Sequence, residues 1–172
     1  LKIGHLRSQG SAIDKDLQVF MTQISEKTDN KFMFEVYRNG RLGDYSVVQE
    51  RVSFGEVDLF VGPFGTAIDK RLMLPTTPYL VNSWDEARKV YSQGSTLFMA
   101  MAGFLEEQNI KLVGGWPVYF GGIAFNTEVK GYGDPDAAKG VKLRVPPMKT
   151  FQLLADTTGY LGTPIPFSDA FT

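Results

Sequence analysis

Residues 140–167 constrain the possible folds of this chain more than any other segment. Residues 141–145 read Val-Lys-Leu-Arg-Val, the alternation of a strand with one apolar face, and Pro146-Pro147 then ends strand pairing before a helical stretch. Strand followed by helix is typical of α/β folds, in which ligands bind beyond the carboxyl ends of the strands. Arg144 lies at that end, and its planar five-donor group suits a carboxylate. The run therefore predicts a bound organic acid.

A second interpretation of the same residues is open. Lys142 and Arg144 would then only form the solvated face of an edge strand. A buried arginine is costly without a partner, and residues 140–151 contain no Asp or Glu. The partner of Arg144 must come from elsewhere in the chain or from a ligand.

The first third of the chain alternates strands and helices. A strong turn signal, Asn39-Gly40, lies between two of these elements. Strands are predicted at residues 1–6, 31–38 and 57–61, and helices at residues 16–27 and from the N-cap Asp44 to the terminator Gly55. This order favours a parallel sheet covered by helices on both faces.

The middle of the chain is less regular. Residues 68–80 contain two prolines and should not form one regular element. A helix with a capping box begins at Ser83, breaks at Gly94, and is followed by a helix over 96–108 and strands at 110–116 and 119–126.

We expect two α/β lobes around a cleft. Residues 1–118 would form most of the first lobe, and residues 119–172 the start of a second, incomplete lobe. Ser168-Asp169 reads as a helix start only a few residues before the chain stops. We therefore expect a C-terminal truncation.

Composition argues against several classes of function. With 18 basic and 19 acidic residues the net charge is −1, without the basic stripe of a nucleic-acid binder, so nucleic acid is not an expected partner. Cysteine is absent, which excludes disulfides, thiolate zinc sites and Cys nucleophiles, and no metal or cofactor is expected. No apolar run is long enough for a membrane span, so neither insertion nor a signal peptide is expected within these residues.

Four stretches together resemble the substrate-binding subunit of tripartite ATP-independent periplasmic (TRAP) transporters, the DctP type. They are Val-Tyr-Arg-Asn-Gly-Arg-Leu-Gly-Asp-Tyr at 36–45, Gly-Glu-Val-Asp-Leu at 55–59, Leu-Pro-Thr-Thr-Pro-Tyr-Leu at 74–80, and Lys-Gly-Val-Lys-Leu-Arg-Val-Pro at 139–146 with Gly-Thr-Pro-Ile-Pro-Phe-Ser-Asp-Ala-Phe-Thr at 162–172. The last pair is the most specific. The resemblance implies a periplasmic-binding-protein type II-like clamshell, mostly parallel sheets flanked by helices, that delivers an organic acid to TRAP membrane subunits from the periplasm as a monomer.

The resemblance also implies roles for single residues. Arg144 matches the arginine that pairs with the ligand carboxylate, and Phe167 matches an aromatic residue that lines the site. Pro147 stands where some members place an asparagine contact, so that contact is lost. Loops of the first lobe that approach the ligand hold Arg7 and Gln9, and also Phe64; solvated surface is the alternative for Arg7.

A further departure from the family concerns the ligand. Some members carry a second arginine after the hinge, where this chain has Gly121 or Gly122, so one guanidinium is expected at the site. With Phe120 and other aromatic residues nearby, we hypothesise a monocarboxylate with a bulky, partly apolar tail. The alternatives are that these aromatic residues are core and that the glycines form a bulge or hinge.

Two other classes of function stay open. An enzyme would need a nucleophile and a base, and the one histidine, His5, lies in a strand where packing or exposure is the simpler reading. A ligand-sensing effector module of a regulator is the stronger rival, because clamshell folds serve both purposes. We expect a binding protein and no catalysis.

Overall fold

The computed structural model describes residues 1–170, so Phe171 and Thr172 of the last family motif lie outside the described residues. Strands β1 (Lys2–His5), β2 (Glu35–Tyr37) and β3 (Leu59–Val61) form one sheet in the order β2-β1-β3, with both pairings parallel. The central strand pairs Ile3 with Val36 on one side and with Leu59 on the other. The predicted parallel sheet is confirmed.

Two helices connect these strands and begin at side-chain caps. Helix α1 (Ala12–Lys27) starts four residues earlier than the sequence predicts, because the Ser11 hydroxyl accepts a hydrogen bond from the Asp14 amide at 3.3 Å. Helix α2 (Tyr45–Ser53) begins after Asp44, as predicted, and Gly55 follows it with a φ of 75°. Strand β2 is shorter than predicted, because its ladder with β1 begins at the pair Lys2 and Glu35, and only the terminal amino group of Leu1 reaches further back, to the Met33 carbonyl oxygen.

A helical layer follows the sheet. It consists of the 3-10 helix η1 (Lys70–Thr76), α3 (Trp84–Tyr91) and α4 (Thr96–Glu106), and its buried centre is Leu72, Met101 and Leu105. The segment 68–80 therefore does contain a short helix, with Pro75 inside it. The predicted cap of α3 is confirmed: the Glu86 amide donates to the Ser83 hydroxyl at 3.2 Å.

The strands predicted at residues 110–116 and 119–126 are wrong. This segment has no strand pairing within the described part of the chain, and most of its side chains are exposed. It passes so close to α3 that a Cβ at Gly115 would lie 2.1 Å from the Tyr91 carbonyl oxygen. An alternating pattern predicts an extended backbone but does not supply the neighbour that a strand needs.

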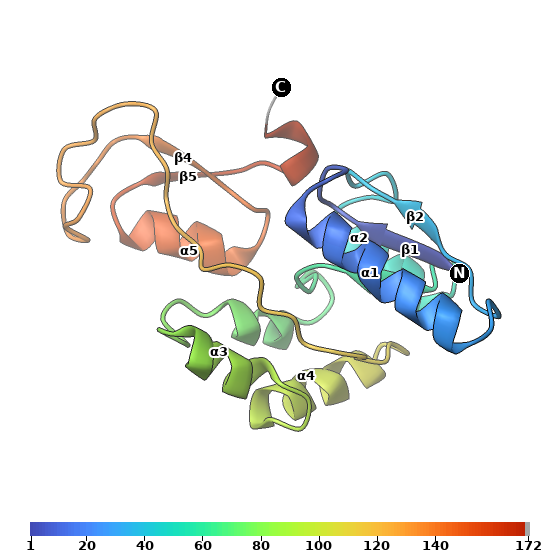
Figure 1. The fold of residues 1–172 in the computed structure, drawn as a ribbon. Helices are drawn as coiled ribbons and strands as arrows, with labels where there is room; N and C mark the ends of the chain where they lie inside the picture. The colour runs from blue at the N-terminus through green and yellow to red at the C-terminus, as the bar shows by residue number, and fades with distance from the viewer. Residues whose placement is uncertain (171–172) are drawn as a thin grey trace.

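A β-α-β unit ends the chain. Strand β4 (Lys142–Val145), helix α5 (Lys149–Thr157) and strand β5 (Leu161–Pro164) form a two-stranded parallel sheet, which confirms the predicted strand and helix around Pro146-Pro147. A single 3-10 turn, η2 (Phe167–Asp169), follows, and its cap Pro166 lies two residues before the predicted cap Ser168. Figure 1 shows this unit on one side of the molecule, the first sheet on the other and η2 between them.

The two sheets are joined by an apolar cluster. Leu6 and Tyr45 come from the first sheet region and Met148 from the start of α5, and all three are buried. Phe60 and Phe151 pack against them. The boundary near residue 118 stays a prediction, and this cluster contains residues from both sides of it.

Candidate anion-binding site

Arg144, in β4, has an incomplete set of hydrogen bonds. Its Nε donates to the Ile165 carbonyl oxygen at 2.9 Å, while its Nη2 is buried without a hydrogen-bonding partner. No Asp or Glu of residues 1–170 forms an ion pair with it. A half-buried guanidinium with an unpaired donor favours a ligand partner over a solvated edge strand. Its role in binding stays a prediction.

Arg7, in the loop between β1 and α1, reaches the same place from the other sheet. Its guanidinium carbon lies 4.3 Å from the centre of the Phe167 ring and 5.6 Å from that of Tyr119, and its Nη2 donates to the Tyr119 hydroxyl. The guanidinium carbon of Arg144 lies 6.0 Å from the same Phe167 ring. Two guanidinium groups therefore flank one aromatic side chain, and whether one or both of them contact the ligand stays a prediction.

Tyr45, the first residue of α2, is a member of this site that sequence reasoning missed. It is 5% exposed, and its hydroxyl makes no hydrogen bond within residues 1–170. Burial raises the pKa of Tyr45, whereas the positive charges of Arg7 and Arg144 act in the opposite direction. The signal available in the sequence was its place directly after the Asp44 cap. The site therefore combines two cations with one neutral hydroxyl.

The other predicted residues lie in different surroundings. Phe64 packs against the Leu72 cluster, and Phe120 makes an edge contact with Trp84 at 4.9 Å between ring centres. Gln9, Gly121 and Pro147 are exposed, and a Cβ at Gly121 would meet nothing within 4 Å. The structure thus brings together Arg144, Arg7 and Phe167, and leaves the remaining predicted contacts apart from them.

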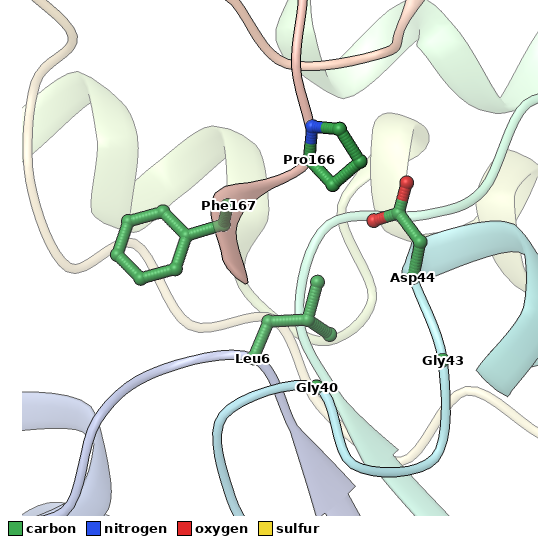
Figure 2. Close-up of a pocket in the computed structure, with 6 residues that line it drawn as sticks. All are labelled: Leu6, Gly40, Gly43, Asp44, Pro166 and Phe167. Atoms are coloured by element: carbon green, nitrogen blue, oxygen red, sulfur yellow. The ribbon is translucent and has the colours of Figure 1, made fainter. Parts of the chain in front are cut away.

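A pocket of about 210 Å³ adjoins the site without containing its cations. It is lined by Leu6, Gly40, Gly43, Asp44, Pro166 and Phe167. Figure 2 shows the Phe167 ring turned away from Asp44, the one charged residue of this lining. A carboxylate in the wall disfavours an anion there, so the arginine side of the Phe167 ring is the better candidate for an anion-binding site.

Comparison with known proteins identifies the family. The model for bacterial extracellular solute-binding proteins, family 7, named DctP, matches residues 3–172. The chain belongs to this family, as the sequence motifs indicated. The proteins it matches are binding proteins for transport and not enzymes, which agrees with the expectation of no catalysis.

Particular relatives share both sequence and fold. The sialic acid-binding periplasmic protein SiaP of Vibrio cholerae serotype O1 is 24% identical over 178 residues, which cover 99% of this chain and 53% of that protein. A TRAP periplasmic solute-binding protein from Haemophilus influenzae RdAW, with bound L-gulonate, superposes with a TM-score of 0.80 at 24% identity over 99% of this chain and 55% of that one. A TRAP periplasmic solute-binding protein from Desulfovibrio salexigens, with bound orotic acid, superposes with a TM-score of 0.79 at 20% identity. The match covers 97% of this chain and 53% of that one.

This chain spans about half the length of those relatives. The α/β expectation is confirmed by the superpositions. Within residues 1–170, no helix combines the length and apolar character needed to cross a bilayer.

Proposed function

We propose that this chain belongs to an extracytoplasmic solute-binding protein that captures an organic acid through Arg144. One observation carries the proposal: the buried Nη2 of Arg144 has no hydrogen-bonding partner within the described residues, beside a second guanidinium on the same ring. A carboxylate offers two acceptor oxygens to a guanidinium fork. The ligand would complete the hydrogen bonds that the protein leaves open.

The finer proposal concerns the class of acid. Arg144 would bind the carboxylate of a monocarboxylate, and the faces of Phe167 and Tyr119 would pack on a bulky, partly apolar tail. Arg7 and the Tyr45 hydroxyl would take a second polar oxygen of the ligand. Relatives with bound L-gulonate and orotic acid support an acid that carries further polar groups.

Delivery completes the proposed function. By analogy with the family, the ligand would be trapped between two lobes in the periplasm and passed to TRAP membrane subunits by a monomeric binding protein. The Leu6, Tyr45 and Met148 cluster packs residues of the two sheet regions against each other.

Isothermal titration calorimetry with L-gulonate, orotate, succinate and malate tests the proposal. Arg144→Lys keeps the charge but loses the fork, so we expect binding of the preferred acid to weaken at least about tenfold. The matched control is Arg88→Lys, since Arg88 is 70% exposed in α3 and forms a surface ion pair with Asp85 at 2.9 Å. Unchanged affinity in Arg144→Lys would refute the role of Arg144. Tighter binding of succinate or malate than of the monocarboxylates would remove the finer proposal alone.

A further inference from the structure

His5 ends β1 and is almost completely buried, with 1% of its surface exposed. Its Nδ1 accepts a hydrogen bond from the Arg7 backbone amide at 3.2 Å. Its Nε2 lies 3.2 Å from Oδ1 of Asp14, in α1. Because Nδ1 is an acceptor here, the proton of a neutral imidazole must be on Nε2, where it is donated to Asp14. The hydrogen-bond partners thus assign both the charge state and the tautomer.

Asp14 keeps its charge inside this network. Its carboxylate accepts hydrogen bonds from Arg38 Nε at 2.7 Å, from the Gly10 amide at 2.9 Å and from Gln18 Nε2 at 3.0 Å. Burial raises the pKa of Asp14, but the bonds from Gly10 and Arg38 outweigh it and the pKa is lowered. Asp14 therefore does not depend on a charged His5 for its partner.

The backbone amide and the carbonyl oxygen of Arg7 both form hydrogen bonds that hold its loop in place. The Arg7 amide donates to His5, and the Arg7 carbonyl oxygen accepts from the Asn39 amide at 3.1 Å. Asn39 and Gly40 have φ values of 57° and 67°, so the Asn-Gly turn adopts the left-handed conformation that this approach requires. The side chain of Arg7 then reaches Phe167 from a fixed backbone.

We propose that His5 is a positioning residue for ligand capture: its neutral imidazole holds the Arg7 backbone so that the Arg7 guanidinium lies on the Phe167 ring. This inference rests on the proposed role of Arg7 as a ligand contact. A proton on Nδ1 would face the Arg7 N–H as a second donor and break the link. The charged groups that face His5 are Asp14 from α1, Arg38 from the segment after β2, and Arg7.

Protonation sets the direction of the pH effect. Burial lowers the pKa of His5 below 6.5, and outweighs the hydrogen bond and the charge of Asp14, which raise it. The link to Arg7 is therefore intact above that lowered pKa and is lost as the pH falls through it. Ligand affinity should fall in the same window, while a carboxylic acid ligand stays ionised down to about pH 4.

Two variants of His5 distinguish the roles of its two ring nitrogens. In His5→Asn the amide oxygen can take the place of Nδ1 as the acceptor for Arg7, whereas in His5→Gln the longer side chain reaches towards Asp14 and leaves the Arg7 amide without an acceptor. Asp14 retains its other donors in both. A purely structural role for the His5 and Asp14 contact would favour Gln, and a positioning role favours Asn.

The experiment measures hydrogen exchange of the Arg7 amide and the dissociation constant of orotate on the full chain, across about pH 5 to 8. In the wild-type protein, protection of that amide and affinity should fall together below pH 6.5. His5→Asn should stay protected and lose the pH inflection, and His5→Gln should lose protection and bind about three- to tenfold more weakly.

Opposite results overturn the inference. Full protection of the Arg7 amide in His5→Gln would do so, and so would protection that does not change while the imidazole titrates in nuclear magnetic resonance spectra of the wild-type protein. If the wild-type protein does not bind orotate, the amide exchange decides the role of His5 by itself. Loss of Arg7 amide protection in His5→Gln with an unchanged affinity for orotate counts against the proposed binding role of Arg7 and not against the His5 link.

Discussion

Arg7 and Arg144 approach one Phe167 ring from two different sheets, and the protein holds them in different ways. The backbone of Arg7 is bonded at its amide and its carbonyl, and its guanidinium donates to Tyr119. Arg144 has one hydrogen bond through Nε and a buried Nη2 without a partner in residues 1–170. The first arginine is positioned by the protein alone, while the second keeps a buried donor that a ligand would pair with in the proposed function. In the free protein, therefore, the contacts of Arg7 are already formed, whereas those of Arg144 are incomplete.

Among the residues that support the Arg7 loop, substitution of Asp14 should cause the largest loss of stability. Asp14→Asn keeps the volume but removes the charge that Arg38, the Gly10 amide and His5 share, so we expect the free energy of unfolding to fall by about 3 kcal/mol. Urea unfolding measures the change. Asp85→Asn is the control, because Asp85 is 86% exposed in α3, and it should change the stability by at most about 0.5 kcal/mol. Equal stability of the two variants would show that the network does not hold the loop.

Arg144 should behave in the opposite way. Arg144→Met removes a guanidinium whose Nη2 is unpaired, so the lost bond to Ile165 is offset by relief of the buried donor. We expect the ligand-free stability to change by less than about 1 kcal/mol, while affinity for the preferred acid falls at least about tenfold. Urea unfolding and calorimetry on the same preparation give both values. A large loss of stability with unchanged affinity would make Arg144 a structural residue.

A contrast between local patterns and long-range contacts explains which elements could be predicted from the sequence. The strand with Arg144, the Pro146-Pro147 stop and the following helix are local patterns, and the structure confirms them. The strands expected at 110–116 and 119–126 also had a local pattern, but they lack paired neighbours in the described chain. Pairing depends on distant residues, which periodicity does not encode.

The site was predictable to the same extent. Arg144 and Phe167 lie in one motif and were found, whereas Tyr45 is adjacent to Arg7 and Arg144 only because α2 packs under the β1 loop. The packing alternative for His5 is confirmed by its burial, but its bond to the Arg7 amide depends on the ring nitrogen that faces the loop. Residue types and spacing do not specify such an orientation.

The smallest expected effect is that of removing the Tyr45 hydroxyl, which tests its contribution to binding apart from that of the two arginines. Tyr45→Phe keeps the ring in the Leu6 and Met148 cluster and removes only a hydroxyl that has no hydrogen bond within residues 1–170. Ligand-free stability should therefore change by less than about 1 kcal/mol, because the ring stays packed and the hydroxyl has no hydrogen bond to lose. If the ligand accepts or donates a bond at this hydroxyl, its dissociation constant should rise by about three- to tenfold. Calorimetry with L-gulonate and orotate measures it, and an unchanged constant for both would place the second polar oxygen of the ligand at Arg7 alone.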